Sequence, residues 1–268
     1  MKAAVLLMAH GTPDSIDEME PYLRNVMKHR APTPAFVAEI QSRYRQIGGR
    51  SPLTDITRRH AAKLSARLAL PVYVGMRAWK PFIADAIALA TNDGIDRLVG
   101  LVAAPHYATI SIGAYRAAMK APMETRFVES WHREPALIDC WRRRLKPGLP
   151  VLYTAHSIPV DGAEPYPTQL RQTIEAIGVP GTFSYQSRSP SPIPWLEPDV
   201  DTVLAQLKHD VQVAPIGFVS DHVEVLYDLD ILHAATAKKL GIGYTRVPMP
   251  NDDDLLIEAM ASACARSL

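Results

Sequence analysis

The alternation of short apolar runs with helical patterns is the feature that most constrains the fold of this 268-residue chain. Each apolar run ends at a turn and is followed by a segment with apolar residues at helical spacing. Strands that alternate with helices favour parallel pairing through right-handed crossovers. The sequence therefore predicts an α/β fold with parallel sheets. The expected strands cover residues 5–9, 72–76, 98–104, 125–128, 151–155, 182–186, 211–214 and 242–245.

An internal similarity indicates two related halves. Residues Val5–Pro13 align with Val151–Pro159, and five of the nine positions are identical. Each segment is typical of a buried strand followed by a histidine, His10 in the first half and His156 in the second. Two such lobes would face each other across a cleft, where ligand pockets often form. A chance similarity between two buried strands is the alternative.

Composition excludes several classes of protein. The 29 lysines and arginines nearly balance the 28 aspartates and glutamates, which argues against a nucleic-acid-binding protein. No apolar run is long enough to span a bilayer, and the N-terminus is typical of a first strand rather than a signal peptide. The two cysteines, Cys140 and Cys264, fit a reducing cytoplasm and cannot supply a four-cysteine iron–sulfur cluster. A phosphate-binding glycine loop and a nucleophile elbow are also absent.

A strand end and a row of acidic residues come together in the second half of the chain. The apolar run Val211–Ala214 is followed by a Pro-Ile-Gly turn, and Ser220 is the expected N-cap of a long helix. Asp221, Glu224 and Asp228 would share one face of that helix. This row indicates a cation site or a proton-transfer site, although a solvated acidic face is the common alternative.

Three histidines, His10, His106 and His156, directly follow apolar strands. A neutral imidazole can accept a proton near pH 7 or bind a borderline metal. A single histidine in such a place is more often structural, but three in equivalent places favour a functional site. No closed zinc motif accompanies them.

Basic residues gather in the predicted first lobe. They could hold carboxylate groups of a ligand, or they could simply face solvent. They are Arg24, Lys28, Arg30, Arg43, Arg45 and Arg50.

Several longer motifs resemble those of ferrochelatases, in the family's order and over nearly the whole chain. The two most specific are Thr-Ala-His-Ser-Ile-Pro at 154–159 and Phe-Val-Ser-Asp-His-Val-Glu-Val-Leu-Tyr-Asp at 218–228. The others are Met-Ala-His-Gly-Thr-Pro at 8–13, Arg-Tyr-x-x-Ile-Gly-Gly-x-Ser-Pro-Leu at 43–53, Ala-Pro-His-Tyr at 104–107, Val-Glu-Ser-Trp at 128–131, Pro-Tyr-Pro-x-Gln-Leu at 165–170, Tyr-Gln-Ser at 185–187 and Pro-Trp-Leu-x-Pro-Asp at 194–199.

The resemblance implies two similar Rossmann-like lobes of the chelatase type. Each lobe is expected to contain a parallel four-stranded sheet flanked by helices, with the active-site cleft and its porphyrin between the lobes. The first lobe should comprise residues 1–105 and 247–268, including a C-terminal helix that returns to it, and the second lobe residues 106–246. The chain looks like the compact, soluble bacterial members that act on coproporphyrin III, because it lacks a hydrophobic membrane-binding lip and an iron–sulfur extension.

The resemblance assigns the catalytic and metal-binding roles to His156 and Glu224. Insertion of a divalent metal into a free-base porphyrin releases two pyrrole protons, so a base is needed on the metal's side of the ring. Either residue could bind Fe²⁺ or relay a proton, and the sequence leaves the division of labour open. Asp228 would continue the acidic path outward, for cations or protons.

The same resemblance suggests which residues bind the propionate groups of the porphyrin. They are Lys28, Arg30, Arg43, Ser51 and Tyr115.

Two positions depart from the family pattern. His10 stands where many coproporphyrin-type relatives have tyrosine, and its imidazole could ligate iron from the face opposite His156 or simply line the site. Leu232 stands where some relatives have a further glutamate one turn past Asp228, which puts an outer regulatory Mg²⁺ in doubt.

We therefore expect a cytoplasmic ferrochelatase that inserts Fe²⁺ into coproporphyrin III to give coproheme in haem biosynthesis. The alternatives are protoporphyrin IX as the substrate, a sirohydrochlorin cobalt or nickel chelatase, and a non-catalytic haem or porphyrin carrier. Fe²⁺ is expected as a substrate, with no prosthetic group and no iron–sulfur cluster. The expected partners are the porphyrin, ferrous iron and a transient haem-pathway enzyme that takes the product, with no nucleic acid, no membrane insertion and a monomeric chain.

Overall fold

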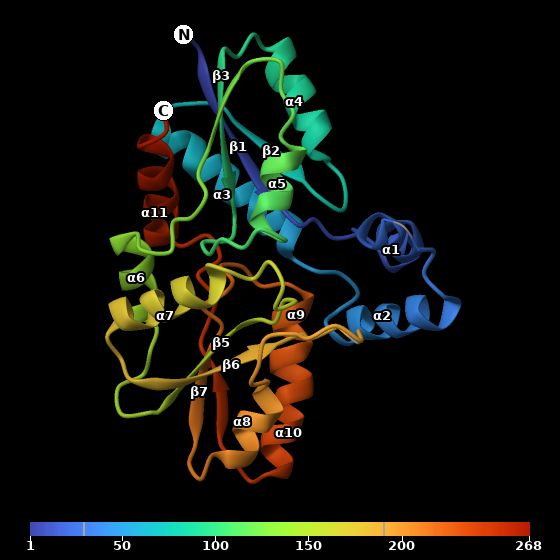
Figure 1. Cartoon of the computed structure of the whole chain (residues 1–268), viewed down its shortest axis with the longest axis vertical. Helices are drawn as coiled ribbons and strands as arrows, with labels where there is room; N and C mark the ends of the chain where they lie inside the picture. The colour runs from blue at the N-terminus through green and yellow to red at the C-terminus, as the bar shows by residue number, and fades with distance from the viewer. Residues whose placement is uncertain (29, 190) are drawn as a thin grey trace.

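The computed structural model describes residues 1–28, 30–189 and 191–268. It forms two lobes, each built on a four-stranded parallel sheet (Figure 1). The sheets have the orders β2-β1-β3-β4 and β6-β5-β7-β8, so the same strand order occurs twice along the chain. This arrangement confirms the predicted α/β fold. The strands are β1 (Ala3–Ala9), β2 (Val72–Met76), β3 (Arg97–Val102), β4 (Glu124–Phe127), β5 (Val151–His156), β6 (Gly181–Gln186), β7 (Val211–Ala214) and β8 (Tyr244–Arg246).

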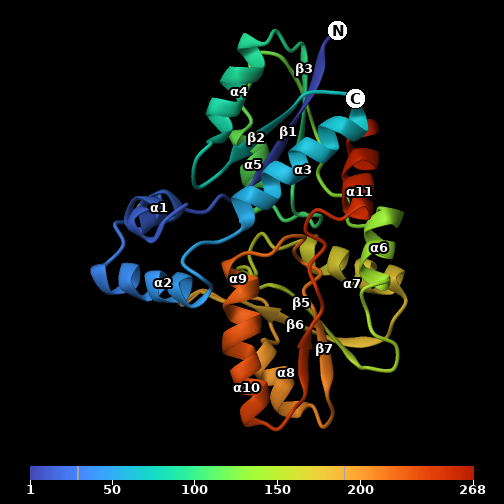
Figure 2. The ribbon, with the colours of Figure 1, turned by 180° about the vertical axis from the view of Figure 1, so that it is seen from behind.

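Helices connect the strands and flank both sheets (Figures 1 and 2). Within the described residues two segments depart from α-helical geometry, the 3₁₀ turn η1 (Ile16–Glu18) and the π-helical segment η2 (Asp228–His233). The α-helices are α1 (Met19–Met27), α2 (Pro34–Gln46), α3 (Leu53–Leu68), α4 (Ile83–Asn92), α5 (Ile112–Ala118), α6 (Pro135–Arg142), α7 (Tyr166–Ile177), α8 (Val200–Gln206), α9 (Val223–Leu226), α10 (Ala234–Lys239) and α11 (Asp254–Ala265).

Strand β1 lies inside the first sheet and buries both of its faces. Val5 and Leu7 belong to a large core that continues into the second lobe, whereas Leu6 and Met8 belong to a smaller core with residues of α4. Alternate side chains of a strand point to opposite faces, so a continuous apolar run is the pattern that a doubly covered strand requires. The carboxyl end of β1 is thereby held rigidly, and His10 follows it directly.

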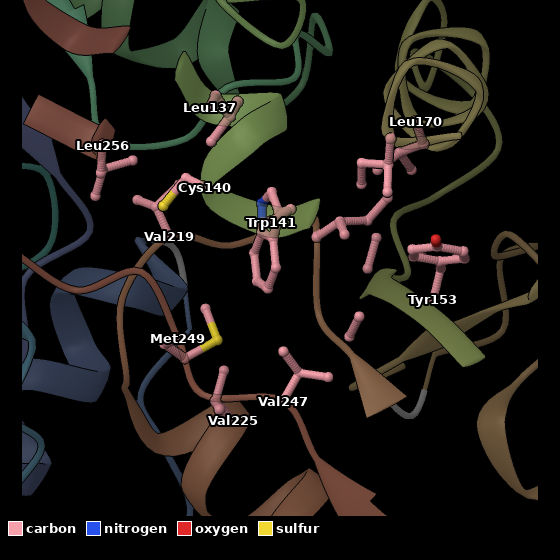
Figure 3. Packing of buried hydrophobic residues seen from close by; sticks show 14 of the residues in the cluster. Leu137, Cys140, Trp141, Tyr153, Leu170, Val219, Val225, Val247, Met249 and Leu256 are labelled. Carbon is pink, nitrogen blue, oxygen red and sulfur yellow. The ribbon is translucent and has the colours of Figure 1, made fainter. Parts of the chain in front are cut away.

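The two lobes share one apolar core around Trp141 of α6. The indole is fully buried, and Figure 3 shows it among Cys140, Val247 and Met249. Val247 and Met249 follow β8, the last strand of the second sheet. Because the same cluster includes Val5 and the other buried residues on that face of the first sheet, the lobes are packed as one body.

The first lobe extends further along the chain than the boundary predicted after residue 105. Strand β4 pairs with β3, and Ile112 and Tyr115 of α5 pack in the core of the first sheet. The predicted boundary is therefore too early, because the crossover after β3 returns to the same sheet. Helix α11 packs against α3 of the first lobe and against α6, in agreement with the expected return of the C-terminal helix (Figure 2).

The long helix predicted after β7 begins later than expected and includes a π-helical segment, and it ends at Leu240, as predicted. Helix α9 begins at Val223 with His222 as its N-cap, and the chain then passes through η2 before α10. The hydroxyl of Ser220, the predicted N-cap, is buried without a hydrogen-bond partner among the described residues. The predicted start is wrong because Asn251 binds the preceding backbone and keeps it out of the helix.

Asp221 consequently lies outside the predicted acidic row. Its carboxylate accepts a hydrogen bond from the Asn251 amide at 2.7 Å and lies 3.3 Å from the Arg246 guanidinium. Glu224 is in α9 and Asp228 begins η2. The row of three carboxylates is therefore reduced to two.

None of the helices in the described ranges combines the length and the apolar character that a membrane crossing requires.

Candidate active site

The candidate site is built where two strand ends and the first turn of α9 meet. His156 is the last residue of β5, and His10 directly follows β1, the equivalent strand of the first sheet. Glu224 is the second residue of α9. The sequence prediction that a histidine at each strand end would contribute to one site therefore agrees with the fold at these two positions.

His156 and Glu224 form an ion pair. The imidazole Nε2 lies 3.2 Å from a Glu224 carboxylate oxygen, and Nδ1 faces the backbone carbonyl of Ser157. Both ring nitrogens thus face acceptors, which favours the doubly protonated imidazolium. Desolvation lowers the pKa of His156, but the Glu224 carboxylate raises it by more, to about 9. The prediction that these two residues, distant in sequence, lie together agrees with this geometry.

The Glu224 carboxylate is held in its charged form by its surroundings. Desolvation raises its pKa, but the neighbouring His156 imidazolium lowers it further, to well below the ordinary value. The Glu224 and His156 side chains remain 38% and 25% exposed, so a ligand can reach both. The pair is therefore a charged and accessible site rather than a buried structural salt bridge.

A buried chain of hydrogen bonds fixes the backbone of Glu224. The Gln186 side-chain amide donates to the Glu224 carbonyl at 2.7 Å, and the Thr154 hydroxyl donates to the Gln186 amide oxygen at 2.7 Å. Gln186 and Thr154 are almost completely buried. Strands β5 and β6 thus anchor the first turn of α9 opposite His156.

His10 is held as a neutral imidazole beside this pair. Desolvation and the nearby Arg77 guanidinium lower the pKa of His10 to about 4. The Glu224 carboxylate raises the pKa of His10, whereas the nearby His156 lowers it. The Tyr22 ring stands edge-on to the imidazole, with the ring centroids 6.3 Å apart. His10 and His156 therefore offer opposite protonation states at neutral pH.

His222 is a site residue that sequence reasoning did not single out. Its Nε2 lies 3.6 Å from the second Glu224 carboxylate oxygen, beyond normal hydrogen-bond length. The Phe218 ring packs edge-on against the His222 ring, with centroids 4.5 Å apart, and against the His156 ring at 6.4 Å. The signal was present in the sequence, because His222 is two residues before Glu224 in the most specific motif.

Asp228 is adjacent to the site but is 95% buried. The Ser187 hydroxyl donates to its carboxylate, and burial raises the pKa of Asp228 despite that hydrogen bond. Its charge also acts on the pKa of His156. Asp228 therefore influences the protonation of the His156–Glu224 pair. Its part in a proton or cation path to solvent stays a prediction.

Two of the five predicted propionate ligands are close to the site. The Arg43 guanidinium of α2 lies 5.3 Å from the centre of the Tyr227 ring and acts on the pKa of Asp228. Tyr115 of α5 is buried, with Arg77 5.2 Å from the centre of its ring. Arg77 was also missed from the sequence, although it directly follows β2, a strand end that faces this site.

The other three predicted ligands have no contact with the pair in the described part of the chain. Lys28 and Arg30 are exposed beyond the end of α1. Ser51 is buried, and its hydroxyl accepts a long hydrogen bond of 3.4 Å from the Leu53 amide at the start of α3. Their role in binding a substrate stays a prediction.

His106, the third strand-end histidine, lies in the core instead of the site. Its Nε2 is 2.8 Å from the Thr173 hydroxyl, and its ring lies 5.7 Å from the His132 ring. Burial lowers the pKa of His106 to about 3. The expectation of three functional histidines was wrong at this position, because the loop after β3 turns toward α7.

Over residues 1–28, 30–189 and 191–268, no three His, Cys, Asp or Glu side chains are arranged to hold a metal ion together. Protein ligands for a structural metal usually number three or four. The arrangement of His156, Glu224 and His10 is instead one in which a metal ion would need ligands from another molecule.

Comparisons with known proteins agree with this geometry. A family model described as ferrochelatase matches residues 2–268. A ferrochelatase of Herpetosiphon aurantiacus is 37% identical, over 97% of this chain and 97% of its own length. A coproporphyrin III ferrochelatase of Geobacillus kaustophilus is 35% identical, over 97% of this chain and 94% of its own.

Solved structures show the same two-lobed fold. The sirohydrochlorin chelatase SirB of Bacillus subtilis subspecies spizizenii, in complex with cobalt, has a TM-score of 0.58 at 12% identity, covering 100% of this chain and 95% of that one. CbiX, described as the terminal enzyme of siroheme biosynthesis in denitrifying bacteria, has a TM-score of 0.58 at 14% identity, covering 99% of each chain. These likenesses show the fold alone. The family match over nearly the whole length shows more: this chain belongs to the ferrochelatase family, and it is an enzyme that inserts a metal into a porphyrin.

Proposed function

We propose that this enzyme inserts Fe²⁺ into coproporphyrin III, with His156 and Glu224 as the catalytic pair. The observation that carries the proposal is the 3.2 Å contact between the two side chains at the meeting point of the lobes. Insertion replaces two pyrrole N–H bonds with N–Fe bonds, so two protons must leave the porphyrin. A charged carboxylate and a titratable imidazole on one side of the ring supply the groups that this exchange needs.

The protonation states divide the work between the two residues. At neutral pH the His156 side chain already carries two protons. The imidazolium must therefore release one to solvent before His156 can accept a pyrrole proton. The approach of a dication favours that release, since metal charge competes with the proton. Glu224 remains an anion throughout: it attracts Fe²⁺ and balances the charge of His156, which accepts the two pyrrole protons one after the other and releases each to solvent.

His10 is proposed as a ligand to iron from the porphyrin face opposite His156. Because its pKa is near 4, His10 presents a free nitrogen lone pair at every physiological pH. His10→Ala should release the product faster and alter the absorption spectrum of bound coproheme, whereas His10→Tyr should give a phenolate-type spectrum. An unchanged spectrum in His10→Ala would show that the residue only lines the site.

The cationic groups on the first-lobe side fit the four carboxylates of coproporphyrin III. Arg43 lies beside Tyr227 and Arg77 beside Tyr115, and the two arginines belong to different elements, α2 and the segment after β2. Guanidinium groups bind carboxylates bidentately, which also fixes the orientation of the ring. Relatives support this choice of substrate, because several that are 32–35% identical are coproporphyrin III ferrochelatases.

The decisive experiment uses purified protein and Fe²⁺ under anaerobic conditions. Coproporphyrin III and protoporphyrin IX are compared as substrates, and the expected result is a higher kcat/KM for coproporphyrin III. Faster insertion into protoporphyrin IX would reassign the substrate within the family. Binding of porphyrin without any insertion would favour the carrier alternative and would overturn the proposal.

A cobalt or nickel chelatase for sirohydrochlorin is a second candidate, because the solved neighbours SirB and CbiX share the fold. The identity to those chains is only 12–14%, against 37% to ferrochelatases. A competition assay with Co²⁺ and sirohydrochlorin in the same buffer separates the two functions. The expected absence of prosthetic groups, the monomeric state, the cytoplasmic location and the transfer of product to a pathway enzyme stay predictions.

A further inference from the structure

We propose that Asn251 is a positioning residue for metal insertion, which acts by clamping the backbone that leads into Glu224. This inference rests on the proposed function of the His156–Glu224 pair. Asn251 lies in the loop between β8 and α11, and no contact joins it directly to either member of the pair within the described residues. Its effect is carried by the segment Val219–Asp221.

Three hydrogen bonds join Asn251 to this segment. The Asn251 backbone amide donates to the Val219 carbonyl at 2.8 Å, and the Asp221 backbone amide donates to the Asn251 side-chain oxygen at 2.8 Å. The Asn251 side-chain nitrogen donates to the Asp221 carboxylate at 2.7 Å. Side chain and backbone of Asn251 therefore replace the hydrogen bonds that a helix would have provided here.

The clamp matters because Glu224 lies in the first turn of a helical run that continues through η2 into α10, and His222 gives this start no side-chain cap hydrogen bond. The first backbone amides of a helix have no partner within the helix, so the segment before them must be held from outside. Glu224 lies three residues after Asp221, so the direction of its side chain depends on where that segment is held. Gln186 supports the Glu224 carbonyl from the other side.

The clamp is also tied to both lobes. The buried His60 of α3 lies in the first lobe, and its Nε2 donates to the Asn251 carbonyl at 2.6 Å. The Arg246 guanidinium lies 3.3 Å from the Asp221 carboxylate and 2.6 Å from Asp230 in η2. The same cluster therefore connects α3 to the segments before and after α9. It thereby holds the Glu224 carboxylate beside His156, at the end of strand β5.

The backbone of Asn251 allows a specific test. Its φ is +48°, a left-handed conformation that glycine adopts freely and asparagine more readily than most residues. Asn251→Gly therefore keeps the backbone bond to Val219 and removes both side-chain bonds. Ala69→Gly is the matched control, because Ala69 has a φ of +52° at the end of α3 and lies outside the clamp.

A second pair of variants tests the contact itself. Asn251→Asp places a carboxylate oxygen against the Asp221 carboxylate, where the two like charges repel. Exchange of the two residues, Asp221→Asn with Asn251→Asp, restores one donor and one acceptor at this contact. It also leaves the net charge of this cluster unchanged.

The variants are compared by anaerobic Fe²⁺ insertion into coproporphyrin III, by thermal unfolding and by crystal structures. For Asn251→Gly we expect kcat to fall by about 100-fold, the cost of a misplacement of about 1 Å, with little change in porphyrin KM or Tm. Ala69→Gly should match the wild type, Asn251→Asp should lose activity, and the exchanged pair should recover most of it. In the Asn251→Gly crystal structure the Glu224 carboxylate should leave its 3.2 Å contact with His156.

Each alternative result overturns the inference. An unchanged kcat in Asn251→Gly, a loss matched by an equal loss of folded protein, or failure of the exchanged pair to recover activity would each do so. If the wild type inserts no iron, the proposed function fails, and the crystal structure still decides the clamp: an intact His156–Glu224 contact in Asn251→Gly rules it out.

Discussion

Replacement of Glu224 by glutamine should remove most of the charge that keeps His156 protonated. The pKa of His156 is about 9, against an ordinary 6.5, and this difference corresponds to about 3 kcal/mol of preference for the imidazolium. The Glu224 carboxylate is 38% exposed, so solvent screening reduces the contribution to about 1–2 kcal/mol. Desolvation remains in the variant, and the pKa of His156 should therefore fall to 6.5 or below.

The sign of the pH dependence follows from the raised pKa. A group whose folded-state pKa lies above its unfolded value stabilises the fold below the unfolded pKa, and the stabilisation is lost as pH rises through the folded one. The wild type should therefore lose about 1–2 kcal/mol of unfolding free energy between pH 6.5 and pH 9 that Glu224→Gln does not lose. The contributions of the other titrating groups are the same in the wild type and in Glu224→Gln, so they cancel in this difference.

Urea unfolding of both proteins at pH 6.5 and above pH 9 measures the effect, and NMR titration of the His156 ring protons locates its pKa. The reasoning is refuted if the two proteins lose the same stability across this interval. It is also refuted if His156 still titrates near pH 9 in Glu224→Gln.

Two further variants test substrate binding and the shared core. Arg43→Ala should raise the KM for coproporphyrin III by about tenfold, the value of one charge-assisted carboxylate contact, with kcat nearly unchanged. Arg43 forms a surface ion pair with Glu39, so the control is Arg67→Ala, which removes the surface ion pair of Arg67 with Glu258; an equal KM in both variants would exclude Arg43 as a ligand. Trp141→Ala should lower the unfolding free energy by about 3–5 kcal/mol, because the indole is fully buried between the lobes. Leu89→Ala, at a side chain that is 57% exposed, should cost less than about 0.5 kcal/mol by the same urea assay, and similar losses would contradict the shared core.

Strands were predicted well where the apolar run alone decides the structure. β2 and β7 have the predicted bounds, Val72–Met76 and Val211–Ala214, because each is a short, mostly apolar run that ends at a turn. The start of α9 was missed because it depends on Asn251, thirty residues later in the chain. A helical pattern cannot reveal a partner that lies outside the helix, so Ser220 was wrongly taken as the cap.

The candidate site shows the same division between local and distant causes. The motifs around His156 and Glu224 were sufficient to predict that the two side chains meet. The neutral state of His10 depends on its burial and then on Arg77 from another strand end, and the core position of His106 involves Thr173 of α7. Neither neighbour is close in sequence, so residue type and strand position could not separate a site histidine from a core histidine.

Anaerobic Fe²⁺ insertion by His156→Ala tests the central claim most directly, with coproporphyrin III binding measured on the same sample. The account predicts that the porphyrin still binds and that insertion slows by at least about 100-fold, because the proton acceptor beside Glu224 is gone. Insertion at a rate close to the wild type would contradict it.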